Sequence, residues 1–312
     1  MSAPIVVTGS HRSGTTWVGR MLCASGEAGY IHEPLNPVRR PNWNKRPVPY
    51  WYVYICDENQ ERYAPSFDDL LRFRYPIVAN LKDPRSLARL GTFATEALGS
   101  IRLRRRQPRP LLKDPFALFS TEWLARTLGA KIVVTIRHPA AFVGSIKRLD
   151  WQFKFKKVLS QDLLMRDWLH PFEEEMRRCR DQDVDIVEQG IVLWKVLHHV
   201  VDELRRRHPD WVFVRHEDLA ADPVGGFERL YAACELTWDE RAAAEVRTYS
   251  SASGRKELPT WRHGSVKRDS AAAAETWRRR LSPDEIARVK KGVGEVATRF
   301  YPDAEWEPAP QP

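Results

Sequence analysis

A short apolar run, followed by a turn bracketed by two glycines, constrains the fold of this chain more than any other stretch. Ile5, Val6 and Val7 are β-branched and apolar, which is typical of a buried parallel strand. The turn runs from Gly9 to Gly14, and the apolar residues after it recur every three to four positions, as in a helix. Because the N–H groups of such a turn converge at the helix N-terminus, the segment predicts an anion-binding site.

The two glycines have the spacing of a phosphate-binding loop, but the residue after the second one differs. A nucleotide triphosphatase carries Lys there, to reach the phosphates, and then a hydroxyl residue for magnesium. In this chain the position holds Thr15, and the cation lies inside the loop, at Arg12. The sequence therefore predicts a P-loop-like cradle for a phosphate-like group, without the lysine and magnesium apparatus of a triphosphatase.

The composition indicates a basic globular protein. The chain has 312 residues, enough for one large α/β domain, and a formal net charge of +9, which favours polyanionic partners. The four cysteines show neither close pairing nor the spacing of a metal site, so we expect a reduced, cytoplasmic protein without a bound metal. No leader precedes the first strand and no apolar run has the length of a membrane span, so we also expect a soluble protein.

Hydrophobic periodicity predicts one α/β domain over residues 1–312, with a parallel sheet of about five strands and helices on both faces. Four strands are expected after the first, at 30–31, 110–113, 131–137 and 211–215. Helices are expected at 15–24, 67–74, 87–101, 119–128, 187–207, 239–249 and 281–300, and another begins at Pro139.

Residues 34–110 and 150–186 are expected to be insertions that form an acceptor site or its lid. Within the first, residues 34–66 are irregular, rich in proline and aromatic residues, and too long for an ordinary connection. They either cover a functional site or form an insertion whose aromatic side chains pack on the body, and the sequence leaves both interpretations open. We expect a basic linker at 102–110 and a frayed, proline-rich tail at 304–312.

Two motifs resemble those of the sulfotransferases that use 3′-phosphoadenosine 5′-phosphosulfate (PAPS). Residues 9–17 resemble the 5′-phosphosulfate loop of that family, and a strand ending at Arg137, with Ser145 on the next helix, resembles its 3′-phosphate motif. The resemblance implies PAPS as co-substrate, bound by Arg12, Ser13, Gly14, Thr15, Thr16, Trp17, Arg137 and Ser145. The basic Arg-Lys-Gly loop that some members close over the 3′-phosphate is absent, which leaves Lys267 and Arg268 as candidates there.

The resemblance also implies in-line sulfuryl transfer to an acceptor hydroxyl, in which positioning and charge stabilisation supply most of the rate. Arg12 and Lys113 are the cations expected at the transferring group. The acceptor proton needs a base. Glu33, at a strand end and followed by proline, resembles the carboxylate of the carbohydrate and protein-tyrosine branches. The small-molecule branch has His after its third strand, which this chain lacks, and Asp114 and His32 stay open as alternative bases.

Some polar residues are expected to have structural roles. His198 and His199 lie in the amphipathic 187–207 segment and are expected to pack or face solvent. Glu217 and Asp218 are expected to cap the helix that begins near residue 223. The preceding residue is His, where the family has Tyr, so an adenine contact is not carried over.

Two other classes of function stay open. The first is a P-loop nucleotide kinase or hydrolase, which magnesium-dependent ATP binding would reveal. The second is a non-catalytic polyanion-binding protein, suggested by the net charge and by basic runs at 102–109, 205–207 and 278–280. Because those runs are scattered, we expect no nucleic-acid partner. The acceptor stays open among a glycan, a glycolipid and a phenolic small molecule, as do sulfonation of an amine and the oligomeric state.

Overall fold

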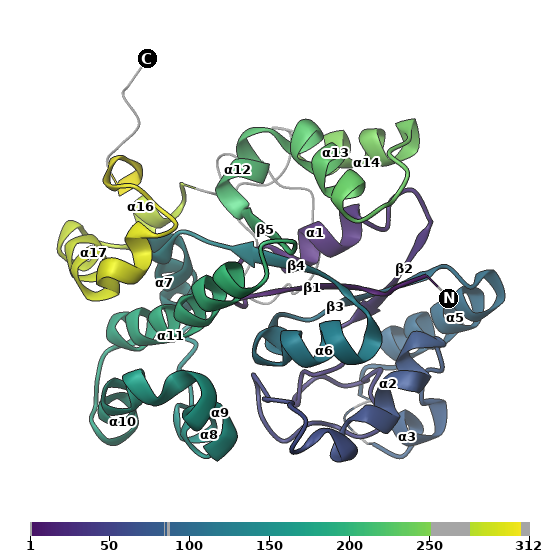
Figure 1. Cartoon of the computed structure of the whole chain (residues 1–312), viewed down its shortest axis with the longest axis horizontal. Helices are drawn as coiled ribbons and strands as arrows, with labels where there is room; N and C mark the ends of the chain where they lie inside the picture. Colours follow the sequence, from purple (N-terminus) through teal and green to yellow (C-terminus); the bar gives the residue numbers. More distant parts are fainter. Residues whose placement is uncertain (1, 84, 86–87, 251–274, 307–312) are drawn as a thin grey trace.

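Five parallel strands form the central sheet, in the order β2-β3-β1-β4-β5 (Figure 1). The computed structural model describes residues 2–83, 85, 88–250 and 275–306. The strands are β1 (Ile5–Gly9), β2 (Ala28–His32), β3 (Arg109–Lys113), β4 (Lys131–Ile136) and β5 (Val212–Arg215). All four neighbouring pairs are parallel, which confirms the predicted α/β class and sheet.

The strand side chains alternate between two apolar cores, as a period of two requires. Ile5 and Val7 belong to one core and Val6 to the other. The first core is covered by α1 (Thr15–Met21), α12 (His216–Ala221), α13 (Pro223–Ala233) and α14 (Glu240–Ser250). The second and larger core is covered by α6 (Thr121–Leu128), α7 (Pro139–Arg148), α11 (Ile186–Arg207) and α17 (Pro283–Thr298). Figure 1 shows α12 to α14 above the sheet, with α6 and α11 below it.

Shorter elements fill the connections. Between β2 and β3 lie η1 (Gln60–Arg62), α2 (Ala64–Leu71), α3 (Ile77–Leu81) and α5 (Leu90–Arg106), and η2 (Pro115–Ser120) follows β3. Between α7 and α11 lie α8 (Lys156–Leu159), α9 (Asp162–Leu164), the π-helical turn η3 (Met165–Leu169), η4 (His170–Phe172) and α10 (Glu173–Asp181). The C-terminal region adds α16 (Trp277–Arg280) and η5 (Asp303–Trp306).

Local signals set the ends of several helices. Asp185 caps α11 by accepting a hydrogen bond from the backbone N–H of Glu188. Ser282 and Glu285 form the capping box of α17. Gly129 ends α6 in the left-handed conformation, which agrees with the predicted helix end at residue 128. Helix α1 ends at residue 21 rather than at the predicted residue 24, and residues 22–24 form turns.

The predicted basic linker at 102–110 is wrong. Residues 102–106 are the last turn of α5, and Arg109 opens β3, so only two residues separate the helix from the strand. The physical reason is that arginine has good helix propensity, and a cation in the last turn interacts favourably with the helix dipole.

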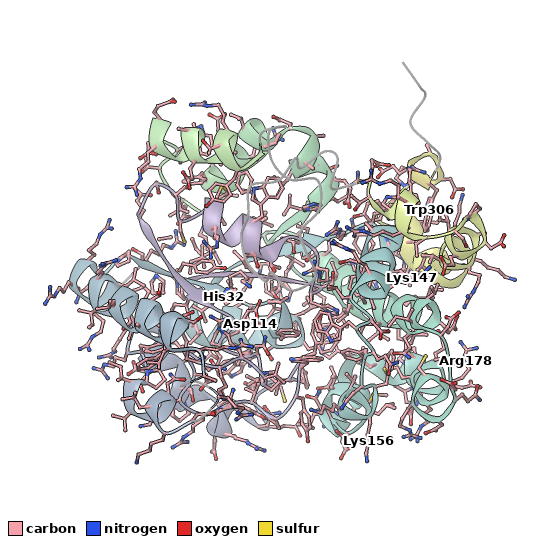
Figure 2. All side chains as sticks on the ribbon, turned by 180° about the vertical axis from the view of Figure 1, so that it is seen from behind. His32, Asp114, Lys147, Lys156, Arg178 and Trp306 are labelled. Carbon is pink, nitrogen blue, oxygen red and sulfur yellow. The ribbon has the colours of Figure 1, made fainter. Side chains whose placement is uncertain are left out.

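Two further predictions are wrong in part. Residues 304–306 are not frayed, because they belong to η5 and Trp306 packs edge-on against the ring of His138, with 4.6 Å between centroids. Figure 2 shows Trp306 beside the C-terminal helices. Neither Glu217 nor Asp218 caps α13: Asp222 does, by accepting from the N–H of Gly225. Glu217 instead accepts from the N–H of His138, and Asp218 accepts from Arg215. The rest of the predicted tail, 307–312, lies outside the described residues.

Residues 34–66 contribute side chains to the main core. Trp43 and Tyr52 are buried there, so packing on the body is confirmed for these two aromatics. Trp51 and Tyr54 stay partly exposed. Among the helices of the described ranges, none combines the length and the apolar character that crossing a bilayer requires.

Candidate active site

The three central strands bring their carboxyl ends together at one edge of the sheet. Strand β1 lies between β3 and β4, so the loop at 9–14 sits beside the residues that follow both neighbours. Strands β2 and β3 lie on one side of β1, and β4 and β5 lie on the other, so the order of the strands changes direction at β1. Ligands of open α/β sheets bind at such a switch point. Lys113 and Asp114 reach this edge from β3, and Arg137 reaches it from β4.

Positive φ angles shape the loop after β1. Gly14 has φ 92° and Arg12 has φ 70°, and the N–H of Ser13 donates to the carbonyl of Ser10 at 3.2 Å. A side chain at position 14 would be obstructed, since a Cβ there would lie 2.5 Å from Nδ1 of His216. The hydroxyl of Ser13 contacts that of Thr135 at 2.6 Å, which ties the loop to β4.

The start of α1 is suited to an anion. Among the described residues, no side chain caps this helix and no acidic residue occupies its first turn. The N–H groups of the first turn and the helix dipole are therefore available to a negatively charged ligand. Thr15 is buried and Thr16 is partly exposed at this end. Trp17 instead packs edge-on against His216 and Phe227, so its ring packs against the core on the α13 side of the sheet.

The two motifs that the sequence singled out meet in space. Nε of Arg12 donates to the hydroxyl of Ser145 at 3.0 Å, and Nη1 of Arg137 donates to the carbonyl of Arg12 at 2.6 Å. Arg137 is buried, and its Nε has no hydrogen-bond partner in the described part of the chain. Burial lowers the pKa of Arg137, and the nearby carboxylate of Glu217 opposes that shift. A guanidinium stays charged in proteins, so this edge keeps a buried cation with an N–H to offer.

A second cation pairs with the candidate base. Nζ of Lys113 donates to Oε1 of Glu33 at 2.5 Å, and Nδ2 of Asn36 donates to Oε2 at 2.8 Å. Burial alone would raise the pKa of Glu33, but the Lys113 charge and these hydrogen bonds outweigh it and lower the pKa to about 2. Glu33 has φ 49°, so the backbone turns sharply at this residue.

The two alternative bases differ from Glu33 in their surroundings. Asp114 is buried, and its oxygens accept from the N–H of Leu35 at 2.5 Å and of Phe116 at 2.9 Å. Burial and the Glu33 charge raise the pKa of Asp114 to about 7, and its hydrogen bonds hold the turn that carries Glu33. Nε2 of His32 lies 3.8 Å from Glu33, and burial lowers the pKa of His32. Figure 2 shows His32 and Asp114 close together at the end of their strands.

Several residues at this edge were missed by the sequence analysis. The hydroxyl of Tyr52 contacts both the N–H of His11, at 3.0 Å, and its Nδ1, at 2.6 Å. No spacing signal points to this pair, because 41 residues separate its members. Asn36 and Trp51 were missed because they lie in an irregular segment without periodicity. The expectation for His198 is confirmed, since it is buried and its Nδ1 contacts the carbonyl of Trp194 at 2.9 Å. Lys267 and Arg268 lie outside the described residues.

This fold and this edge define a parallel α/β protein with a candidate anion-binding site at the switch point of its sheet. Residues 4–240 match the model of the sulfotransferase family, and the chain belongs to that family.

Individual relatives match over shorter stretches. Human carbohydrate sulfotransferase 1 is 34% identical over 90 residues, which are 29% of this chain and 21% of the relative. The rat protein of the same name is 36% identical over 97 residues, 30% of this chain and 23% of the relative. The matches thus span about a fifth of the length of these relatives. Among solved structures, a sulfotransferase domain from the curacin biosynthetic pathway superposes with a TM-score of 0.51 at 13% identity, covering 96% of this chain and 98% of that one, which supports the fold alone.

Proposed function

We propose that this protein transfers the sulfuryl group of PAPS to an acceptor hydroxyl. The observation that carries the proposal is the contact between the two motifs, in which Arg12 is held by Ser145 and Arg137 is held by the carbonyl of Arg12. A ligand with two anionic groups, one in the loop and one at the end of β4, would satisfy both motifs at once.

The residues present fit such a ligand. The uncapped start of α1 and the loop N–H groups suit the 5′-phosphosulfate. The unpartnered Nε of buried Arg137, with Ser145 beside it, suits the 3′-phosphate, because arginine pairs with phosphate through several N–H groups.

Three residues would carry the transfer. Arg12 and Lys113 would stabilise the negative charge that grows on the leaving phosphate oxygen. Glu33 would take the proton of the acceptor hydroxyl as the hydroxyl oxygen bonds to sulfur. The bond from sulfur to the bridging phosphate oxygen would break in the same step. Lys113 pairs with Glu33 at rest, so an anionic donor that draws Lys113 away would raise the basicity of Glu33 as the site fills.

Titration calorimetry tests the donor. We expect 3′,5′-adenosine bisphosphate (PAP) to bind at least about 30-fold more tightly than adenosine 5′-monophosphate, since a buried charged contact to the 3′-phosphate is worth about 2 kcal/mol or more. Ser145→Ala is expected to reduce that preference, and Ser160→Ala, an exposed serine on the far insertion, is expected to leave it unchanged. Equal affinity for the two nucleotides would contradict the assignment of the 3′-phosphate site.

A further inference from the structure

Exposed apolar side chains gather on one part of the surface. In the described part of the chain, the large apolar residues that are exposed all come from the connection between β2 and β3. They are Val38, Ile77, Val78, Leu81, Leu90, Leu98 and Ile101. We call this set the α3–α5 surface, because all of its members except Val38 lie on those two helices. Val78 and Leu90 keep 65% and 62% of their surface exposed, so these side chains are not marginal cases.

The segments that carry these residues lie against one another. The loop that holds Val38 reaches α5 through the ion pair of Arg39 with Glu96. The same loop reaches α3, since the N–H of Asn42 donates to Oδ1 of Asn80 at 2.9 Å. Figure 1 shows α3 and α5 at the same end of the molecule. Single exposed apolar residues are ordinary, but a cluster on neighbouring elements is typical of an interaction site.

Helix α5 has two apolar faces. One face packs against the larger core and carries Phe93, Ala97 and Leu103. The other face carries Leu90, Leu98 and Ile101, whose separations are close to whole turns of a helix. A helix on the surface of a globular domain needs only the first face. The second face is left uncovered by the residues that the structure describes.

Exposed cations border the α3–α5 surface. They are Lys82, Arg89, Arg102, Arg104 and Arg105. Lys82 directly follows α3, Arg89 precedes α5, and the other three lie at the C-terminal end of α5. Within the described ranges, none of the five forms an ion pair. In the basic run at 205–207, by contrast, each arginine pairs with a carboxylate.

The charge of this surface restricts what can cover it. Its two acidic neighbours are already paired, Asp83 with Arg40 and Glu96 with Arg39. A symmetric contact with a second copy would therefore place cations against cations. An anionic bilayer offers an apolar layer and a high density of negative charge at the same time. Charge complementarity thus favours a lipid surface over a second copy of this chain.

The α3–α5 surface adjoins the candidate active site. The N–H of Val38 donates to Oδ1 of Asn36 at 3.2 Å, and Nδ2 of Asn36 donates to Oε2 of Glu33 at 2.8 Å. One side chain therefore connects the edge of this surface to the candidate base.

We propose that the α3–α5 surface docks this protein on anionic membranes. The apolar side chains enter the boundary between headgroups and acyl chains, and the arginines at the end of α5 contact the lipid headgroups. The inference goes beyond the proposed function and does not depend on it, because docking needs neither a sulfuryl donor nor an acceptor.

Cosedimentation of the full chain with vesicles, in the absence of nucleotide, tests the proposal. The probes are vesicles of phosphatidylcholine with about one third phosphatidylserine, and vesicles of phosphatidylcholine alone. The apolar variant is Leu98→Gln. Its control is Leu163→Gln, a partly exposed leucine that follows α8 in the other insertion.

The charge variant is Arg104→Gln with Arg105→Gln. Its control, Arg177→Gln with Arg180→Gln, removes the same charge from α10, where Arg177 pairs with Glu173 and Arg180 with Asp181. Figure 1 shows α10 and α5 at opposite ends of the molecule.

We expect the wild type to bind the vesicles that contain phosphatidylserine and to bind phosphatidylcholine alone much more weakly. The charge variant should weaken binding about tenfold or more, because each arginine contributes about fivefold at an anionic surface. Leu98→Gln should weaken binding about threefold or more, because an apolar side chain no longer leaves water. This loss cannot come from charge, since the variant keeps the net charge. Both controls should bind like the wild type.

Other results would overturn the inference. It is wrong if the wild type does not sediment with the anionic vesicles, or if Leu98→Gln binds as well as Leu163→Gln. It is also wrong if the α10 variant loses as much affinity as the α5 variant, since net charge alone would then explain the binding. Light scattering without vesicles tests the alternative occupant. A dimer that Leu98→Gln dissociates would show that a second copy covers this surface.

Discussion

A buried ion pair controls the proposed chemistry of Glu33. We expect Glu33→Gln to lower turnover at least about 100-fold, because glutamine cannot take the proton of the acceptor hydroxyl. The affinity for PAP should change less than about threefold. Turnover and calorimetry with PAP measure the two effects.

The matched control for this variant is Glu235→Gln. Glu235 also pairs with a lysine, Lys131, at 2.6 Å, but at the amino end of β4, on the edge of the sheet away from the loop. Its turnover should equal that of the wild type. A Glu33→Gln enzyme with nearly normal kcat would show that another group is the base.

The same carboxylate should make stability depend on pH. Its folded pKa of about 2 lies below the ordinary value of 4.5, so the stabilisation is fully present above pH 4.5 and is lost as the pH falls toward 2. Glu33 is only 18% exposed, so solvent screens its ion pair with Lys113 little. Urea unfolding should therefore show a larger difference between wild type and Glu33→Gln at pH 7 than at pH 3. A difference that does not change with pH would contradict this origin of the stabilisation.

At the scale of elements, close packing between α1 and β3 positions Lys113. Gly19 lies inside α1, and a Cβ there would come within 2.9 Å of Cγ of Lys113. We expect Gly19→Ala to lower kcat by displacing Lys113, even though alanine favours a helix by about 1 kcal/mol over glycine. Gly99→Ala on α5 is the control, because its Cβ would meet nothing within 4 Å.

The control variant should gain about 0.5–1 kcal/mol in the free energy of unfolding without a change in kcat. Urea unfolding and initial rates measure both quantities. If Gly19→Ala kept the wild-type kcat, the close approach of α1 to β3 would not position Lys113 for catalysis.

The elements that build the site differ in how far the sequence predicts them. The β1 loop, the end of β4 and Ser145 follow from local patterns, because each is a strand end or a helix face. The contacts of Asn36 with Trp51 and Glu33 do not, since Asn36 and Trp51 lie in an irregular segment without periodicity. The error at 102–106 has a similar origin: a run of arginines is polar enough for a linker, but it equally suits the last turn of a helix.

At the scale of the whole molecule, the net charge of +9 should act on the binding of an anionic nucleotide. We expect PAP affinity to fall about tenfold between 50 and 500 mM salt, because the screening length shortens from more than about 10 Å to about 4 Å. The affinity for adenosine, which lacks the phosphate charges, should change little over the same range. Calorimetry at both salt concentrations measures this difference, and equal salt dependence of the two ligands would contradict it.

The α/β class and the parallel sheet were predictable because strand and helix patterns alternate along the chain, whereas the strand order and the contact between the two motifs were not. Arg12 and Ser145 are 133 residues apart, and only the sheet order places β1 beside β4. The coverage of the end of β4 by Trp306 depends in the same way on tertiary packing, which no local pattern reveals.

The central claim is that Arg12 and Arg137 form a PAPS site, and a thermal-shift titration tests it most directly. Wild type and Arg137→Ala are each measured with PAP and with ATP plus magnesium. At about 100 times Kd, a ligand adds about 2.7 kcal/mol of stability, which raises Tm by several degrees. We expect PAP to raise the Tm of the wild type and not that of Arg137→Ala. A shift with ATP and magnesium alone would contradict the claim and favour a nucleotide kinase or hydrolase.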